Sequence, residues 1–173
     1  MSRVVFILLL MLVLASSLYA DGDAFNITVS VPMVGFECQT IEGAPYRDWR
    51  ISAFVWDTVA MKPPDFVLFV NGSNIPVSIL ASVEDVTEDT SVTRWTPSVV
   101  QGIERFVLQL TTTYILLPPD FSDYIVLLGE PVEVVDFFEV GSSVYLVFRF
   151  LAPGRTSPGT VHRLSVTLIV TAS

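Results

Sequence analysis

Apolar and polar residues alternate along most of the chain after residue 23, which is the pattern of β-strands. Residues 24–31, A-F-N-I-T-V-S-V, place Phe25, Ile27, Val29 and Val31 on one face and small or polar residues on the other. The same alternation recurs at intervals up to the C-terminus. We therefore expect strands at residues 24–31, 50–56, 66–70, 75–82, 106–117, 124–128, 132–138, 144–150 and 164–171.

Turn-forming residues separate these segments. Clusters of proline, glycine, asparagine and serine lie at residues 63–65, 71–74, 118–120, 129–131, 141–143 and 153–159. Turn signals at this spacing, between short alternating strands, are typical of a β-sandwich. Only residues 96–105 offer a short helix or turn, so the pattern predicts a single all-β domain.

The N-terminus follows a different pattern. Arg3 precedes an unbroken apolar run at residues 4–14, and small residues lead to Ala20. This order is the layout of a secretory signal peptide, and the run is short for a membrane span, which needs about 20 apolar residues. We predict that residues 1–20 are removed and that the mature protein is secreted, on or outside the cell surface. The alternative is a retained N-terminal anchor.

The net negative charge limits the kinds of molecule that the protein is expected to bind. The chain has 173 residues, with 9 Lys and Arg against 18 Asp and Glu, and a formal net charge of −9. Such an acidic protein is not expected to bind nucleic acid or, after signal cleavage, an anionic membrane. Cys38 is the single cysteine, so an internal disulfide is excluded, and its setting favours a buried apolar role over a reactive thiol.

Side chains that carry catalysis are few. His162 is the only histidine, and there is no G-x-S-x-G motif, so we expect neither an enzyme nor a cofactor. We interpret His162 as a solvated turn residue. Glu84, Asp85, Glu88 and Asp89 form an acidic cluster whose oxygens are candidate Ca²⁺ ligands. Because the cluster lacks a glycine-punctuated calcium loop, we favour a solvated acidic loop.

Three further residues are candidates for the surface. Asn26 in N-I-T and Asn71 in N-G-S match the N-glycosylation motif, and Asn71 is the stronger candidate because it falls at a turn. Trp95, beside Arg94 and the acidic loop, is the aromatic residue that we expect to be exposed.

The order of predicted strands and turns in the C-terminal two thirds of the chain is similar to that of a known protein family. Residues 62–77, K-P-P-D-F-V-L-F-V-N-G-S-N-I-P-V, form a charged turn, a strand and a second turn. Residues 143–172 contain a strand, an A-P turn, a P-G-T turn and a Thr/Val-rich strand ending in T-A. This order resembles the camelysin/TasA family of secreted fibre proteins, in particular archaeal bundling-pilus-type subunits. Pro64 stands where that family has glycine.

The resemblance implies a jelly-roll-like antiparallel β-sandwich at residues 35–173, preceded by a donor strand at residues 21–34. Each subunit would donate this strand to the next, with Phe25, Ile27, Val29 and Val31 as the inserted side chains, which is a form of β-augmentation. The protein would then be a homopolymeric subunit of an extracellular filament or pilus that bundles cells in a biofilm.

Three alternatives remain open at this level. Residues 24–31 are equally suited to be the first strand of their own sandwich. The protein would otherwise be a monomeric secreted or cell-surface binding module, with Trp95 and residues 84–89 as its contact region. A hydrolase, in line with activity ascribed to camelysin-like proteins, would need metal ligands that the sequence does not cluster.

Overall fold

The computed structural model of the chain describes residues 25–30, 36–156 and 159–173. The described chain is all-β, with 0% helix and 53% strand, which confirms the predicted fold class. Its strands are β1 (Phe25–Ser30), β2 (Glu37–Gln39), β3 (Asp48–Ala53), β4 (Thr58–Ala60), β5 (Val67–Val70), β6 (Val77–Asp85), β7 (Thr96–Pro97), β8 (Arg105–Thr113), β9 (Ile125–Leu127), β10 (Val132–Phe138), β11 (Ser143–Leu151) and β12 (Val161–Ala172).

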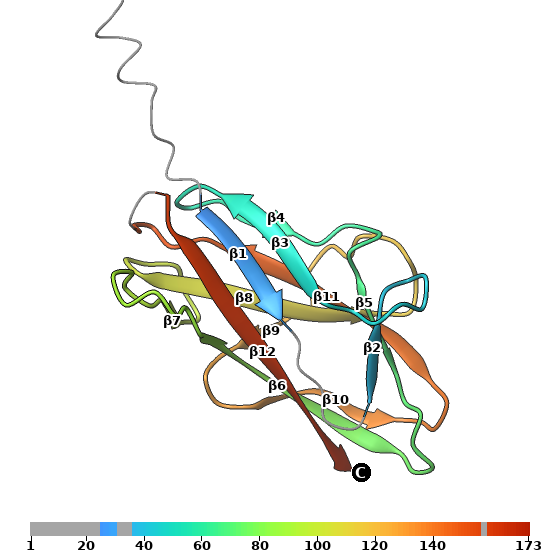
Figure 1. The fold of residues 1–173 in the computed structure, drawn as a ribbon. Helices are drawn as coiled ribbons and strands as arrows, with labels where there is room; N and C mark the ends of the chain where they lie inside the picture. Colours follow the sequence, from blue (N-terminus) through green and yellow to red (C-terminus); the bar gives the residue numbers. More distant parts are fainter. Residues whose placement is uncertain (1–24, 31–35, 157–158) are drawn as a thin grey trace, which may run out of the picture.

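The strands form two sheets that pack face to face as a sandwich (Figure 1). The first sheet has the order β10-β6-β12-β1-β3. The second has the order β2-β5-β11-β8-β7, with β4 also pairing with β11 and β9 with β8. Of the pairings between described strands, only β1 with β12 and β7 with β8 are parallel. The sandwich is therefore antiparallel everywhere except beside its first strand and at one short edge.

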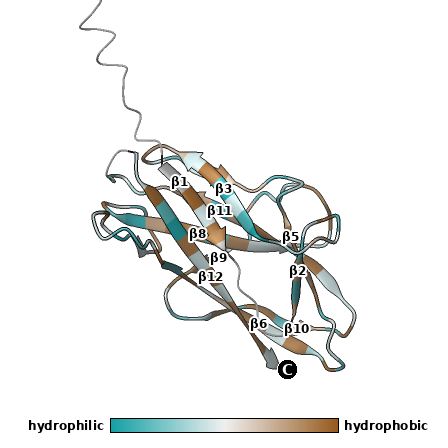
Figure 2. Cartoon of the chain, viewed as in Figure 1, coloured by the Kyte–Doolittle hydropathy of each residue, from teal (hydrophilic) through white to brown (hydrophobic). Residues whose placement is uncertain are grey.

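The core lies between the two sheets and is built by the alternation of the strands. In β12 the residues from His162 to Leu168 are alternately buried and partly or fully exposed, and Figure 2 shows the same alternation as bands of hydropathy along the strands. Fully buried phenylalanines fill the interior: Phe66, Phe69, Phe106, Phe148 and Phe150. Burial of each contributes about 1.5–3 kcal/mol of free energy, as does burial of each large aliphatic side chain packed around them.

Residues 96–105 were expected to form a short helix or a turn, and the structure has the turn. They contain β7 and a tight turn in which Gly102 and Arg105 exchange backbone hydrogen bonds of 3.2 Å. The short strands β2, β4 and β7 were not predicted, because two or three residues are too few to display a period-two pattern. These segments are strands because their backbones pair with neighbouring strands, and the residue pattern does not predict which backbones pair.

The predicted signal peptide at residues 1–20 lies outside the described residues and stays a prediction. Within residues 25–30, 36–156 and 159–173, no helix is long and apolar enough to cross a membrane.

Candidate functional site

The first strand lies inside the first sheet, with a hydrogen-bonded neighbour on each side. β1 runs parallel to β12, with Ile27 opposite His162 and Val29 opposite Leu164. It runs antiparallel to β3, with Ile27 opposite Ile51. The strand that comes first in the sequence is therefore second from the edge of the sheet, and it joins β3 to the rest of that sheet.

The alternation of β1 sends its apolar side chains into the core. Ile27 and Val29 are both 0% exposed, which confirms the inward face predicted for them. Their burial contributes about 3–6 kcal/mol gross, at about 1.5–3 kcal/mol for each side chain. The side chain of Phe25 and the whole of Val31 lie outside the described part of the chain. In this single chain β1 fills its own sandwich, and its donation to another copy stays a prediction.

β1 occupies the space between β12 and β3, which we call the β1 seat. If β1 left this seat, β12 and β3 would each present an unpaired backbone edge, and the core beside Ile27 and Val29 would open. Such an edge is a ready template for another strand. Any strand that occupied this place would need to supply the same backbone bonds and the same two apolar side chains.

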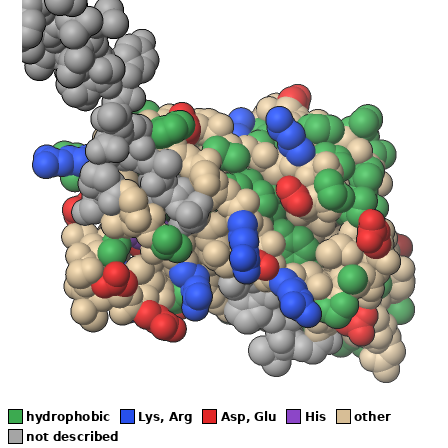
Figure 3. Space-filling view, turned by 45° about the horizontal axis from the view of Figure 1, so that its top comes forward, with side chains coloured by type: hydrophobic (Ala, Val, Ile, Leu, Met, Phe, Trp, Pro, Cys, Tyr) green, Lys and Arg blue, Asp and Glu red, His purple; other side chains and the backbone are tan. Residues whose placement is uncertain are grey.

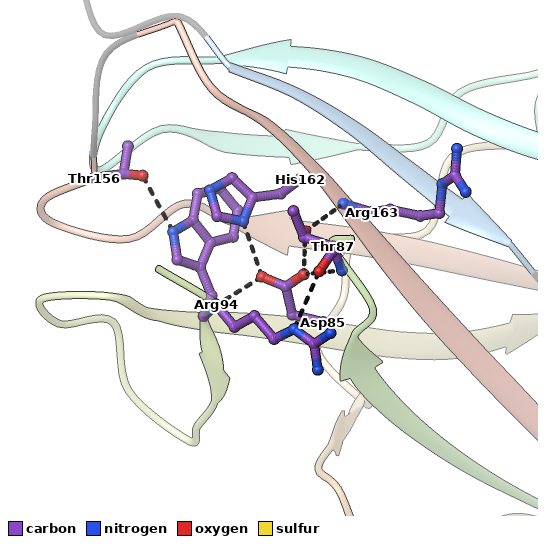
Figure 4. Close-up of polar contacts among 7 residues, drawn as sticks. Asp85, Thr87, Arg94, Thr156, His162 and Arg163 are labelled. Atoms are coloured by element: carbon purple, nitrogen blue, oxygen red, sulfur yellow. Dashed lines mark hydrogen bonds and ion pairs between the residues drawn. The ribbon is translucent and has the colours of Figure 1, made fainter. Parts of the chain in front are cut away.

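A buried, hydrogen-bonded cluster around Asp85 and His162 lies directly beside this seat (Figure 4). His162 Nδ1 lies 2.8 Å from Asp85 Oδ2, and the two side chains are 0% and 1% exposed. His162 stands near the start of β12 and Asp85 at the end of β6, which are antiparallel neighbours. Because Ile27 is the register partner of His162, β1 covers one flank of the pair.

Besides the contact with His162, Asp85 accepts hydrogen bonds from two residues of the loop between β6 and β7. The backbone N–H of Trp95 donates to it at 2.8 Å, the backbone N–H of Thr87 at 2.9 Å, and the Thr87 hydroxyl also donates. That hydroxyl in turn accepts from the backbone N–H of Arg163 at 3.0 Å. Burial raises the pKa of Asp85, but the hydrogen bonds from His162, Thr87 and Trp95 outweigh it and hold the pKa below the ordinary 3.8.

Trp95 completes the cluster. Its indole stacks on the His162 ring, with centroids 3.5 Å apart and an interplanar angle of 15°, and its Nε1 donates to Thr156 Oγ1 at 3.1 Å. Among the described residues, no hydrogen-bond partner lies at His162 Nε2. The predictions of an exposed Trp95, which is 3% exposed, and of a solvated His162 are therefore both wrong. The loop between β6 and β7 folds back and buries them together.

The carboxylates that were candidate Ca²⁺ ligands do not converge. Asp85 points inward and is held by the bonds above, whereas Glu84, Glu88 and Asp89 are exposed. Asp89 accepts from the backbone and hydroxyl of Ser91 instead. Within the described residues, no group of three or more His, Cys, Asp or Glu side chains could hold a metal ion. Alternation along β6 turns Glu84 outward and Asp85 inward, and Glu88 and Asp89 follow in the loop, so the cluster is a buried acid beside the solvated loop that the sequence favoured.

Asn71 is a buried structural residue. Its side chain is 0% exposed, and its Nδ2 donates to the carbonyl oxygens of Ile75, Phe138 and Glu139 at 3.3, 2.9 and 3.1 Å. Its Oδ1 accepts from the backbone and hydroxyl of Ser73. A glycan on Nδ2 is incompatible with this packing, so the predicted glycosylation of Asn71 is wrong for the folded chain. The Asn26 side chain is outside the described part, and its glycosylation stays a prediction.

The sequence context of Cys38 predicted a buried apolar setting, and its side chain lies in a largely apolar one. It is partly buried and packs against the core, and burial raises the pKa of its thiol to about 12. The thiolate is therefore scarce at neutral pH, and the thiol is unreactive for this reason.

Comparison with known proteins adds no relative. No protein-family model matches this chain, and no curated protein matches it. The resemblance to the camelysin/TasA family stays a prediction.

The alternation of inward and outward positions on two strands could have indicated the buried pair from the sequence. Asp85 continues the inward series Ile79, Ala81, Val83 on β6, and His162 begins the inward series Leu164, Val166 on β12. Two titratable residues at inward positions of different strands indicate a buried pair, although the pattern does not say which strands are neighbours.

Proposed function

We propose that this protein is a structural subunit of an extracellular filament. In the filament, β1 of one copy occupies the seat between β12 and β3 of the next copy. The observation that supports this proposal is the place of β1, which is first in the sequence but enclosed between two strands of its sheet. The acidic surface would then govern how neighbouring filaments bundle.

The exchange needs no contact beyond those already described. A neighbouring copy supplies the same residues 25–30, so the backbone pairings and the burial of Ile27 and Val29 are the same within one chain and between chains. Five residues, 31–35, separate β1 from the described body of the domain and span at most about 18 Å when extended. Concentration and the reach of this linker therefore decide between the two arrangements. A one-way exchange does not close on itself, so it grows a filament.

A pair of engineered cysteines tests the exchange directly. Thr28 and Arg50 are opposite each other in the antiparallel pairing of β1 with β3. Cα atoms of such partners lie about 4.5–5.5 Å apart, within the range that a disulfide spans. The variant Thr28→Cys/Arg50→Cys, in a Cys38→Ala background, is oxidised after assembly and run on a denaturing, non-reducing gel.

The proposal predicts a ladder of covalent oligomers from the assembled sample. A cross-linked monomer alone would show that β1 stays in its own chain and would refute the proposal. Each single-cysteine variant serves as the matched control, because neither can form the intended bond.

Removal of residues 21–31 is the second arm of the test. The truncated chain should form no filaments, and an added peptide of residues 21–31 should bind it and raise its melting temperature by filling the seat. Filaments of the truncated chain, seen by negative-stain electron microscopy, would contradict the proposal.

A monomeric secreted or cell-surface binding module is the second candidate function. Trp95 is buried and cannot serve as its contact, but Trp56 is 57% exposed and offers an aromatic surface. This candidate predicts a monodisperse monomer at high concentration, whereas the filament proposal predicts assembly.

A further inference from the structure

We infer that the last part of β12 pairs with the same segment of a second copy of this chain, so that two copies share one continuous sheet. The inference goes beyond the proposed function and does not depend on it, because it uses a strand edge that β1 leaves open whichever copy supplies β1. It is carried by the backbone of residues 166–172, which has a strand on only one side among the described residues.

β12 is longer than the strand that pairs with it on one side. β6 pairs with residues 164–172 of β12, whereas β1 pairs only with residues 161–165. Figure 1 shows β12 continuing well past the end of β1 toward the C-terminus. In the part of the chain that the structure describes, β12 has no third strand neighbour. We call the β1 side of residues 166–172 the free edge.

The backbone groups that face the free edge follow from the pairing with β6. Alternate residues of a strand direct their N–H and C=O groups to opposite sides. The Arg163 carbonyl accepts a hydrogen bond from Val86 N–H, just beyond β6, at 2.8 Å, so the odd-numbered residues of β12 face β6. Leu168 and Val170 therefore direct their N–H and C=O groups to the free edge. Such an edge is a template for a further strand.

The sequence after β1 is not suited to fill this edge. Ser30 lies opposite Ser165, so in the same register Pro32 would be the residue that donates to the Val166 carbonyl. Proline has no backbone N–H and cannot make that bond. The free edge is therefore separate from the β1 seat, whether β1 belongs to the same copy or to another.

The free edge lacks the usual protection of an edge strand. Lysines, prolines or bulges normally prevent such edges from pairing with another chain. Residues 164–173 contain no charged residue and no proline, and β12 pairs with β6 without a register shift. On the face that Figure 3 shows, by contrast, charges of both signs lie among the hydrophobic side chains. The edge therefore suits a strand that is itself uncharged.

The strand that fits this edge is the same segment of a second copy. Residues 167–171 read T-L-I-V-T, which is symmetric in side-chain type about Ile169. Antiparallel pairing about a two-fold axis places Ile169 opposite Ile169 and Thr167 opposite Thr171. Pairs of threonines and pairs of aliphatic side chains are favourable across antiparallel strands.

The same register satisfies the backbone. Leu168 lies opposite Val170 of the second copy, and both residues direct their N–H and C=O groups to the free edge, so each such pair exchanges both hydrogen bonds. The register is centred on the free edge, because Ile169 is the middle of residues 166–172. Both copies use the same surface, so the contact closes as a dimer.

A single cysteine at the two-fold axis tests this inference. Ile169 is 39% exposed and would lie opposite itself at a position where Cα atoms are about 4.5 Å apart, which a disulfide spans. Ile169→Cys, in a Cys38→Ala background, should give a covalent dimer on mild oxidation. Val161→Cys is the matched control, because Val161 is exposed on the same strand but lies outside the free edge. No dimer, or equal dimer in both variants, would overturn the inference.

Two further cysteines test the register. Thr167→Cys and Thr171→Cys each place a cysteine opposite a threonine, so either variant alone should give little covalent dimer. An equal mixture of the two should cross-link, because the cysteines then lie opposite each other. Cross-linking of each variant alone, with none added by mixing, would refute antiparallel pairing about Ile169.

A charge at the axis tests the contact without a disulfide. Ile169→Lys brings two lysines directly opposite each other, so the dimer Kd measured by sedimentation equilibrium should rise by about tenfold or more. Because the side chain points away from the core, the monomer should keep its melting temperature. Val161→Lys changes the net charge equally and should leave the Kd unchanged. An unchanged Kd for Ile169→Lys would contradict the inference.

The two proposals fail separately. Ile169→Cys has one cysteine per chain and can give no covalent species larger than a dimer, whereas Thr28→Cys/Arg50→Cys gives a ladder if β1 is exchanged. A ladder without the Ile169→Cys dimer would refute the edge pairing and leave the donated strand. The Ile169→Cys dimer without a ladder would refute the donated strand and leave the edge pairing.

Discussion

Two buried polar centres occupy opposite ends of this sandwich, and their hydrogen bonding is complete to different degrees. Asn71 uses its whole amide, with three bonds donated by Nδ2 and two accepted by Oδ1. Asp85 is also fully engaged, but its partner His162 has Nε2 without a hydrogen bond among the described residues. One centre is a closed amide network, and the other is a buried Asp–His hydrogen bond with one ring nitrogen left without a partner among the described residues.

The difference indicates which end of the domain opens more easily. His162 is the register partner of Ile27, so water would reach the His162 ring once β1 left its seat. A hydrogen bond from that water would offset part of the cost of opening, since an unsatisfied buried group costs about 1–3 kcal/mol. No such gain exists at Asn71, whose bonds would only be lost. The unpaired nitrogen therefore lies where strand exchange is proposed, and the closed network lies where the fold must stay intact.

The largest effect is expected from removing the Asp85 carboxylate. Asp85→Ala leaves His162 Nδ1 and the N–H groups of Thr87 and Trp95 buried without an acceptor, so the free energy of unfolding should fall by about 3–5 kcal/mol. Urea denaturation of the variant measures this loss. Asp85→Asn is the matched control, because it keeps one acceptor oxygen and should lose less. Equal stability of Asp85→Ala and the wild type would show that the pair is not a determinant of the fold.

A smaller effect is expected from breaking the neutral network. Asn71→Ala removes the donor to the carbonyl oxygens of Phe138 and Glu139, and the unfolding free energy should fall by about 1–3 kcal/mol. Gly72→Ala is the control at the next position, where an added Cβ meets nothing within 4 Å, and it should leave stability nearly unchanged. A glycan found by mass spectrometry on Asn71 of the folded protein would contradict the buried role.

The smallest effect, and the one that distinguishes the two centres most clearly, concerns pH. The pKa of Asp85 in the folded state lies below its ordinary 3.8, so the folded state favours the ionised form. Its contribution is fully present above the unfolded pKa and is lost as pH falls through the folded pKa. Acid titration of stability below about pH 4 should be shallower in Asp85→Asn than in the wild type. Asn71→Ala should keep the wild-type slope, because an amide does not titrate, and matching slopes in all three proteins would refute the assignment.

Much of the fold could be predicted from the residue pattern because strand alternation is local. The faces of β1 and β12, the turns between strands and the all-β class all follow from neighbours two residues apart. The same pattern could not assign Trp95 or Asn71, since each is buried by a segment far away in the sequence. Asn71 bonds to carbonyl oxygens 67 and 68 positions away, and Trp95 stacks on His162.

The sequence by itself determined the alternation of the longer strands, the inward positions of Ile27 and Val29, and the acidic charge. Only the tertiary structure decided which strands are neighbours. That choice paired Asp85 with His162, 77 positions apart. The physical reason is that sheet register depends on the packing of the whole core, whereas alternation depends only on the geometry of the extended backbone.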